Sequence, residues 1–204
     1  SKIISEEGVG AIEFHNAKNV IKNNHYDYIY HEHIFYFTLT SINKVLKNHG
    51  LFGFDYFKSP ISGGSYVILF KKKKTIETSK FKKMIGIETR EKLTSINTWK
   101  KLGPICKKHK KNLNDIIKKL KMKKSIAAYG ASARSSTLIN FLNLNNQTIQ
   151  RVFDLNPLKE NLFTPGSYIK IEKPIAKKIN KYDVIFLLAW NFKDEIIKFL
   201  NRVK

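Results

Sequence analysis

Residues 30–33 bring four functional side chains together, in the order Tyr30, His31, Glu32 and His33. An imidazole titrates near neutral pH, so a histidine in this segment is suited to act as a general base. In an extended strand Tyr30 and Glu32 share one face, whereas on a helical turn or in a loop Tyr30 and His33 converge. The pattern is compatible with an aromatic core segment, with an acid–base site, and with a metal site through His31 and His33. A third ligand at a suitable spacing is not evident, so we assign no metal ligand.

A second group of small and polar residues, GASARSST, follows a predicted strand over residues 125–129. Small residues let the backbone approach a ligand closely, and a helix N-terminus presents N–H groups to an anion. The candidate substrate-binding residues here are Gly130, Arg134, Ser135 and Thr137. The segment matches neither GxGxxG nor a P-loop, so a tight turn capped by serine or threonine is the alternative interpretation.

A third candidate pair, Trp190 and Asn191, follows a predicted buried strand over residues 183–189. Ligands of open α/β sheets bind at the carboxyl ends of the strands. Trp190 is placed to stack on a ligand and Asn191 to form a hydrogen bond with it. Packing of Trp190 in the core explains the pattern equally well.

The elements expected in residues 1–74 resemble the second half of a methyltransferase-type α/β domain. They begin with a short buried strand over 9–14 and a helix over 17–24. A second helix is capped by Thr40 or Ser41, carries Ile42, Val45 and Leu46 on its apolar face and ends at Gly50. Strands over 51–57 and 65–70 follow, joined as a hairpin by KSPISGG. A parallel strand needs neighbours, and the chain does not begin with methionine. We therefore expect a C-terminal fragment or a processed piece of a longer protein.

The remaining residues divide into a helical connector over 75–124 and a second, Rossmann-like α/β domain over 125–204. Helical spacing of apolar residues runs from 78 to 123, and Gly103-Pro104 should break or kink it. Strands over 125–129, 152–154 and 183–189 then alternate with helices to about 142, near 174–179 and over 192–201, and residues 157–171 form a long loop. This alternation is typical of a parallel sheet.

Composition excludes several classes of protein. Hydrophobic residues make up 42% of the 204 residues and charged residues 26%, which excludes a disordered tail and a disulfide scaffold. The chain has no apolar run of the roughly 20 residues that a membrane helix needs, so we expect no membrane partner. It has a single cysteine, Cys106, which suits the reducing cytoplasm.

The formal net charge of +22 raises the question of nucleic acid as a partner. Only four of the 38 basic residues are arginine, the preferred residue for phosphate and base recognition. We therefore interpret Lys71–Lys74 and most other lysines as a solvated surface, expect no specific nucleic-acid partner, and keep an anionic small-molecule substrate as an alternative.

Five segments together resemble the sugar C-methyltransferase family: YDYIYHEHIFYFTLTSINKVLKNHGL, SGGS, YGASARSSTLIN, DLNPLKENLFTPGSYIKI and DVIFLLAWNFKDEI. The resemblance covers nearly all of residues 9–200, in the same order. It implies S-adenosylmethionine as cofactor and a nucleotide-linked keto-deoxysugar as substrate. The chain resembles the back of the family's central domain and its C-terminal Rossmann-like domain. The family's zinc-binding cysteine cluster and the glycine-rich loop for S-adenosylmethionine have no counterpart in these residues.

By this resemblance Tyr30, Glu32 and His33 match the family's Tyr-x-Glu-His. The implied roles are His33 as the base that removes the proton beside the sugar ketone, Tyr30 as a donor to the developing oxyanion, and Glu32 as a residue that orients His33 or contacts the sugar. Ser65 belongs to the segment where relatives often have His-Gly-Gly-Ser followed by Arg, and it is a further substrate-binding candidate. The alternative hypothesis is a non-catalytic Rossmann-like module that binds a nucleotide or nucleotide sugar.

Overall fold

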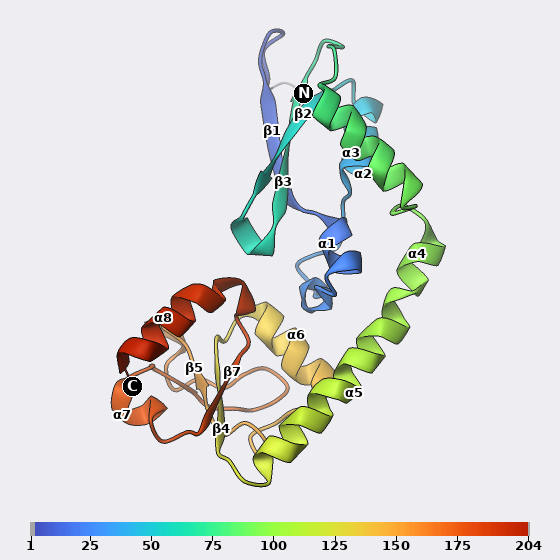
Figure 1. Ribbon diagram of the computed structural model, residues 1–204. Helices are drawn as coiled ribbons and strands as arrows, with labels where there is room; N and C mark the ends of the chain where they lie inside the picture. The colour runs from blue at the N-terminus through green and yellow to red at the C-terminus, as the bar shows by residue number, and fades with distance from the viewer. Residues whose placement is uncertain (1–2, 204) are drawn as a thin grey trace. The chain divides into compact units, whose positions relative to one another are not determined.

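The computed structural model describes residues 3–203, apart from the side chain of Ser62, and divides them into two compact units (Figure 1). Unit 1 holds the residues up to Tyr26 and His33–Ile105, and unit 2 holds Asp27–Glu32 and the residues from Cys106 onward. The fold is mixed α/β, with an antiparallel sheet in unit 1 and a parallel sheet in unit 2. Within residues 3–203, no helix has both the length and the apolar character that crossing a membrane requires. The domain limits expected after residues 74 and 124 remain predictions.

The sheet of unit 1 has three antiparallel strands in the order β1-β3-β2. These are β1 (Gly10–His15), β2 (Phe52–Ser59) and β3 (Ser65–Lys71), and the 3-10 turn η2 (Ile61–Gly63) joins the last two. The predicted hairpin is therefore confirmed. The prediction of β1 as a buried strand with parallel neighbours was wrong, because β1 pairs antiparallel with β3 and turns Ala11 and Glu13 to solvent. An antiparallel strand can leave one face exposed in this way.

Helix α2 (Leu39–Asn48) begins two or three residues earlier than expected, with Thr38 rather than Thr40 or Ser41 as its N-cap. Thr38 and Ser41 cap each other reciprocally. The reason for the earlier start is Glu88, whose buried carboxylate accepts hydrogen bonds from the backbone N–H groups of Leu39 and Thr40. The helix ends before Gly50, which has φ +69° as a stop residue should.

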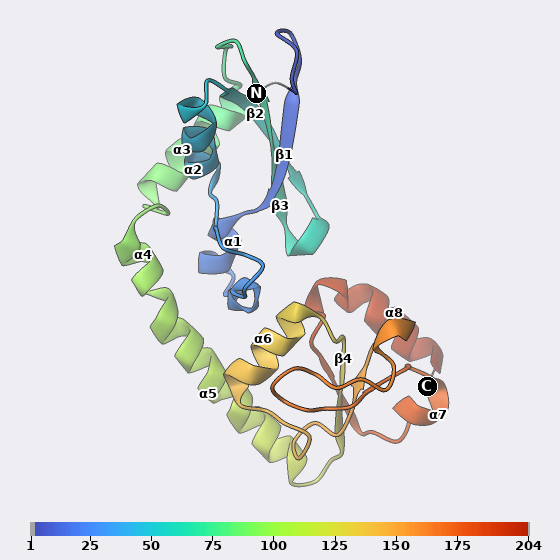
Figure 2. The same cartoon turned by 180° about the vertical axis from the view of Figure 1, so that it is seen from behind.

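Helices α2 and α3 (Ser79–Arg90) both pack against the sheet of unit 1 (Figures 1 and 2). Burial of a large apolar side chain contributes roughly 1.5–3 kcal/mol, so this shared core is the main source of the unit's stability. Its buried members are Phe14, Leu39, Ile42, Leu46, Tyr56, Tyr66, Ile68, Phe70 and Phe81. The short helix α1 (Ala17–Lys22) and the 3-10 turn η1 (Tyr26–Tyr28) lie between β1 and α2 in the sequence.

Helices α4 (Ile96–Lys100) and α5 (Leu102–Lys121) follow α3. The break predicted at Gly103-Pro104 takes the form of a new helix start, because Pro104 lies in the first turn of α5. There its missing N–H leaves no hydrogen bond unmade.

The sheet of unit 2 has four parallel strands in the order β6-β5-β4-β7. These are β4 (Ile126–Tyr129), β5 (Val152–Phe153), β6 (Ile171–Glu172) and β7 (Val184–Leu187). The sequence predicted a loop over residues 157–171 and no strand at its end, where β6 lies. It also predicted β7 as a buried strand, but β7 lies at the edge of the sheet and its residues are only half-buried.

Helices cover this sheet on opposite faces, with α6 (Ala133–Leu142) on one and α8 (Lys193–Val203) on the other (Figures 1 and 2). Strand side chains alternate between faces, so Ala127 and Tyr129 pack in one cluster with α8. The other members of that cluster's buried core are Phe153, Ile179, Ile196 and Leu200. The short helix α7 (Ala176–Ile179) and the 3-10 turns η3 (Pro157–Lys159) and η4 (Trp190–Phe192) complete the unit.

Candidate functional site

A pocket of about 390 Å³, called here the edge pocket, opens in unit 2 at the residues that follow β4, β5 and β7. Because the strands are parallel, their carboxyl ends meet at one edge of the sheet, where ligands of open α/β sheets bind. The pocket is lined by Tyr129, Gly130, Ser132, Asp154, Leu155, Lys159, Ala189, Phe192, Glu195, Ile196 and Phe199. Of the candidates named from the sequence, only Gly130 lines it.

Gly130 allows the turn after β4 to pass close to the turn after β7. Its φ is +100°, and a Cβ atom at this position would lie 2.5 Å from the Cβ of Ala189 and 3.0 Å from its backbone nitrogen. No side chain fits there without displacing backbone. From the sequence, the small residues here are expected to let the backbone approach a ligand. In the structure, the backbone at Gly130 instead closely approaches the turn that contains Ala189.

The first turn of α6 is capped from within the segment GASARSST. Ser132 is the N-cap, and its hydroxyl accepts from the backbone N–H of Ser135 at 3.2 Å. Ser135 is buried, with its Oγ 2.9 Å from that of Ser132, and the Thr137 hydroxyl donates to the Ala133 carbonyl. These contacts agree with the alternative interpretation of this segment, a tight turn capped by serine or threonine.

The edge pocket also contains an acid and a base that the sequence did not single out, Asp154 and Lys159. The Asp154 carboxylate follows β5 directly and accepts from the backbone N–H of Ala131 at 2.7 Å. The Lys159 ammonium lies 3.6 Å from that carboxylate and donates to the Ala131 carbonyl at 2.8 Å. An acidic residue at the carboxyl end of the second strand was the signal that could have identified this pair.

Another part of the edge pocket's lining is apolar and aromatic, formed by Phe192, Ile196 and Phe199. The rings of Tyr129 and Phe199 meet edge to face, with centroids 6.0 Å apart. Burial raises the pKa of the Tyr129 phenol, and the nearby Asp154 carboxylate adds to the increase. A protonated phenol remains a hydrogen-bond donor, so the pocket offers an aromatic surface together with a donor, the two carboxylates of Asp154 and Glu195, and one ammonium group.

Beside this pocket, Arg134 forms what we call the arginine cluster with Asp27, Tyr28 and Trp190. Its Nε donates to Asp27 Oδ2 at 2.9 Å, and its Nη2 forms an ion pair with the same oxygen at 2.7 Å. The guanidinium carbon lies 3.8 Å from the ring centroid of Tyr28 and 4.6 Å from that of Trp190. The indole Nε1 of Trp190 donates to Asp27 Oδ2 at 3.0 Å.

Two of the candidates from the sequence, Arg134 and Trp190, therefore meet on an aspartate that was not predicted. Asp27 is only 5% exposed and Arg134 only 9%. A buried ion pair is tolerated when further contacts compensate for the lost hydration of both charges, as the two rings and the indole N–H do here. The signal for Asp27 in the sequence was an acid inside an aromatic segment just ahead of residues 30–33.

Residues 30–32 form a bend and a turn rather than a strand, so the extended alternative for this segment was wrong. The backbone N–H of Tyr30 donates to the Tyr28 carbonyl at 3.1 Å, and the rings of Tyr30 and His31 meet edge to face. Burial raises the pKa of the Tyr30 phenol, and the Glu32 carboxylate adds to it. His33, the next residue, is half-buried and belongs to unit 1.

The other candidates lie elsewhere. Ser65 is buried at the start of β3, and its hydroxyl donates to the Ile61 carbonyl at 3.1 Å. It lines a pocket of about 490 Å³ in unit 1, where the side-chain amide of Asn19 donates to the Gly64 carbonyl. Asn191 is half-buried in η4 and, with Thr137, does not line the edge pocket.

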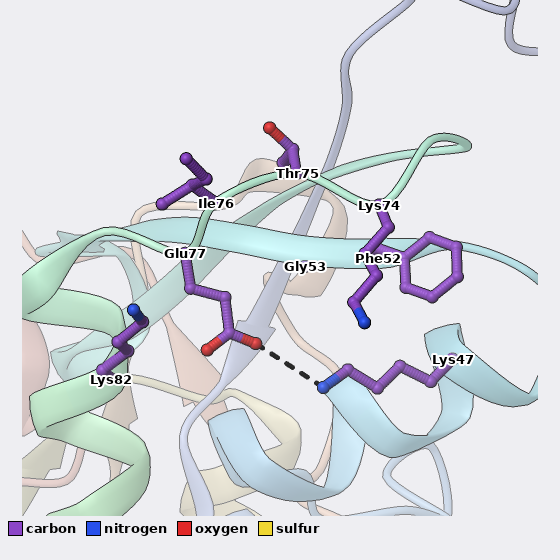
Figure 3. Close-up of a pocket in the computed structure, with 8 residues that line it drawn as sticks. All are labelled: Lys47, Phe52, Gly53, Lys74, Thr75, Ile76, Glu77 and Lys82. Atoms are coloured by element: carbon purple, nitrogen blue, oxygen red, sulfur yellow. Dashed lines mark ion pairs between the residues drawn. The ribbon is translucent and has the colours of Figure 1, made fainter.

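Unit 1 also has a pocket of about 530 Å³ at the strand β2 and the segment before α3. Figure 3 shows the Lys47 ammonium facing the Glu77 carboxylate, 3.5 Å away, with Lys74 and Lys82 on either side. None of the candidate residues lines it. Lys74 and Lys82 are exposed, as the interpretation of the lysines as a solvated surface predicts.

No three His, Cys, Asp or Glu side chains of residues 3–203 lie together as metal ligands would.

Comparison with known proteins identifies the reaction class of the relatives. A family model described as the C-methyltransferase C-terminal domain matches residues 60–204. The chain is 27% identical over 200 residues to C-methyltransferase NovU of Streptomyces niveus, and the match covers 97% of this chain and 48% of that protein. The chain thus spans about half the length of this relative. The family model begins after Tyr30, Glu32 and His33, so it covers the edge pocket but not that segment. The predicted resemblance to C-methyltransferases is confirmed, and the chain belongs to the C-methyltransferase C-terminal domain family.

Proposed function

We propose that this chain is part of an S-adenosylmethionine-dependent C-methyltransferase that acts on a nucleotide-linked keto-deoxysugar, and that unit 2 binds the nucleotide part of that substrate in the edge pocket. The observation that carries the proposal is the position of this pocket. It lies where the strand order reverses, with β5 on one side of β4 and β7 on the other. Ligands of open α/β sheets bind at such a point.

A Rossmann-like arrangement of unit 2 is part of the proposal. Numbered by their order along the chain, the strands of the sheet run 3-2-1-4. This is the order at the start of a dinucleotide-binding sheet, and the Gly130 turn into α6 occupies the place of its phosphate-binding turn. We also keep the division into residues 1–74, 75–124 and 125–204 as a proposal.

The chemistry of the edge pocket suits a nucleotide. Its aromatic wall offers a surface for a flat ring, the Asp154 carboxylate accepts hydrogen bonds from hydroxyls, and the Lys159 ammonium attracts phosphate. Both cations form an ion pair, Arg134 with Asp27 and Lys159 with Asp154. Arg134 is buried and does not line the edge pocket, whereas Lys159 lines it and its side chain is about one third exposed. We therefore assign the phosphate-facing cation to Lys159 and keep Ser135, Thr137, Trp190 and Asn191 as neighbours of this site.

For the reaction, we assign His33 as the base that removes the proton beside the sugar ketone. Tyr30 stabilises the enolate oxygen, and its raised pKa keeps the phenol protonated, as a donor must be. Glu32 orients the base or contacts the sugar, and Ser65 contributes to the substrate site. These roles rest on the resemblance of Tyr30-His-Glu32-His33 to the family's segment.

S-adenosylmethionine, the methyl donor that the family implies, does not fit the described residues of unit 1. A nucleotide-like cofactor is commonly held at a glycine-rich turn between a parallel strand and a helix. Residues of unit 1 within 3–105 form an antiparallel sheet, which offers no such turn. We therefore derive no step through the donor. We place the protein in the cytoplasm because its cysteine, Cys106, is an unpaired buried thiol.

Calorimetric titration of the chain with thymidine diphosphate and uridine diphosphate tests the nucleotide site. We expect micromolar binding, about −8 kcal/mol, for at least one of them. Lys159→Gln should weaken it about tenfold through loss of a charge-assisted contact. The matched control is Lys178→Gln, which removes an ammonium group that pairs with Glu172 outside the pocket. The proposal fails if neither nucleotide binds or if the two variants weaken binding equally.

The second candidate, a nucleotide-sugar-binding module without catalysis, is favoured by the fact that the edge pocket and the whole parallel sheet lie in unit 2 alone. Exchange of the sugar's α-proton with heavy water separates the two functions. A catalytic protein should promote it, and a binding module should not.

A further inference from the structure

The segment Asp27–Glu32 is built into unit 2, although the residues on both sides of it in the sequence belong to unit 1. Its side-chain anchors are Asp27 and Tyr28. Both contact Arg134, which lies 107 residues further along the chain from Asp27. The segment is thus held in place by contacts that its own sequence does not supply.

In the arginine cluster the guanidinium group of Arg134 is largely shielded from solvent and contacts side chains of the protein itself. Arg134 is 9% exposed, and its guanidinium carbon lies over the rings of both Tyr28 and Trp190. Its Nη1 is buried and makes no hydrogen bond to any residue of 3–203. A planar guanidinium can stack on two rings while it forms an ion pair, which an ammonium group on a flexible chain cannot do.

The two residues that hold the segment belong to the turns beside the edge pocket. Arg134 follows the Gly130 turn in the first turn of α6, and Trp190 follows Ala189 after β7. Gly130 and Ala189 both line the edge pocket. The segment therefore takes its position from the two turns that form the pocket.

The anchors lie close to the turn that carries the proposed reaction residues. The Tyr28 carbonyl accepts the backbone N–H of Tyr30 at 3.1 Å, and Glu32 is four residues beyond Tyr28. A movement of Asp27 or Tyr28 is therefore passed directly to Tyr30. A displacement of about 1 Å in a reacting group can cost about 10²-fold in rate.

We propose that Arg134 is a positioning residue that holds the turn of Tyr30 and Glu32 in place through Asp27, Tyr28 and Trp190, and so couples the position of the reaction residues to the edge pocket. The proposal rests on the proposed function for the roles of Tyr30 and Glu32. The holding of the segment does not depend on that function, so it is tested separately.

The structural test is hydrogen–deuterium exchange of the peptide covering residues 27–33 in the 204-residue chain. Arg134→Met removes the ion pair and should accelerate exchange of the Tyr30 N–H at least about tenfold, and Arg134→Lys should restore only part of the protection. Asp27→Asn keeps the shape and an acceptor, and should give an intermediate result if Arg134→Met does not fold. The control is Arg151→Lys, which changes an arginine paired with Glu172 elsewhere in unit 2. Unchanged exchange in both Arg134 variants overturns the proposal.

The functional test measures methyl transfer in the full protein and nucleotide binding to each variant. Arg134→Lys should lower kcat about 10²-fold and change the dissociation constant of thymidine or uridine diphosphate less than about twofold. If Arg134 instead binds phosphate directly, nucleotide binding weakens at least about tenfold while exchange of residues 27–33 is unchanged, and the proposal is wrong. If the unmodified protein binds no nucleotide and transfers no methyl group, the proposed function fails, and the exchange experiment still decides whether Arg134 holds the segment.

Discussion

Each unit buries a charged residue that holds a distant segment, but the two residues do so in different ways. In unit 1 the carboxylate of Glu88, 1% exposed, accepts from the backbone N–H groups that begin α2. In unit 2 the Arg134 guanidinium contacts the segment it holds through the side chains of Asp27 and Tyr28. A backbone N–H is present at every residue except proline, so the contact in unit 1 constrains the sequence little. The contact in unit 2 requires an acid at residue 27 and aromatic rings at 28 and 190.

The buried charge of Glu88 in unit 1 therefore stabilises the start of a helix, whereas that of Arg134 in unit 2 positions one specific segment. Unit 1 has an antiparallel sheet and a helix start that needs a buried acceptor. Unit 2 has a parallel sheet whose carboxyl edge opens into a pocket.

The largest expected effect follows substitution of His33, the residue of unit 1 that comes directly after the turn held by unit 2. In the full protein His33→Asn should lower turnover about 10²–10⁴-fold, because a general base contributes that much. It should also suppress exchange of the sugar's α-proton with heavy water, a step that needs the base and not the methyl donor. His31→Asn is the control and should change both much less. If His31→Asn is the more damaging change, the base assignment is wrong.

The next largest effect is on the stability of unit 1. Glu88→Ala leaves the N–H groups of Leu39 and Thr40 and the Thr40 hydroxyl without their acceptor. We expect a loss of about 3 kcal/mol in the free energy of unfolding, measured with denaturant. The control is Glu77→Gln, which removes the partly exposed ion pair with Lys47 and should cost less than about 1 kcal/mol. Equal losses in the two variants would contradict the role given to Glu88. A loss of nucleotide binding in Glu88→Ala would contradict the assignment of the nucleotide site to unit 2 alone.

A glycine substitution gives opposite results in the two units. Gly130→Ala should destabilise unit 2 by about 1–3 kcal/mol and weaken nucleotide binding, because its φ is +100° and the new Cβ meets Ala189. Gly86→Ala, in helix α3 of unit 1, meets nothing within 4 Å and should stabilise by roughly 0.5–1 kcal/mol. Thermal unfolding measures both. A tolerated alanine at residue 130 would show that the two turns of the edge pocket do not need their close approach.

The smallest effect is the response of both units to acid. In unit 1 burial raises the pKa of Asp55, but hydrogen bonds from the Thr78 hydroxyl and the Tyr56 N–H, with the Lys80 ammonium, outweigh it and lower the pKa below its ordinary 3.8. A lowered pKa in the folded state contributes stability above the ordinary value, and that stability is lost as pH falls through the folded value. We expect under about 1 kcal/mol from this group. Asp55→Asn should flatten the stability profile between about pH 4 and pH 2.

Glu172 is the counterpart in unit 2. Burial raises the pKa of its carboxyl, and Lys178 and Arg151 outweigh burial and lower it below the ordinary 4.5. Glu172→Gln should flatten the acid branch in the same direction, and Glu160→Gln, at an exposed glutamate, is the control. Stability that rises on acidification below pH 4 would contradict both assignments.

Elements with a local cause were predictable from the sequence. The hairpin of β2 and β3 follows from Pro60, whose ring restricts φ, and from Gly63 and Gly64, which adopt positive φ without a steric cost. The turn into α6 follows from a glycine that has positive φ and a serine that caps the helix three residues before Ser135. The start of α5 follows from a proline that fits only the first turn of a helix. In each of these, the determining residues lie within a few positions of the feature.

The tertiary structure decided what depends on partners far away in the chain. The direction of β1 is set by pairing with β3, in which Phe14 lies opposite Tyr66. The start of α2 is set by Glu88, 48 and 49 residues away from the groups it binds. The partner of Arg134 is an aspartate 107 residues earlier. The type and spacing of residues indicate which interactions a side chain can form. Many groups in a chain could pair with the same charge, so only the folded structure shows which distant group the side chain contacts. The sequence by itself therefore determined the local turns, the presence of the main helices and the family. The tertiary structure decided where α2 begins, and that the arginine predicted to face an anion contacts an aspartate and two aromatic rings instead.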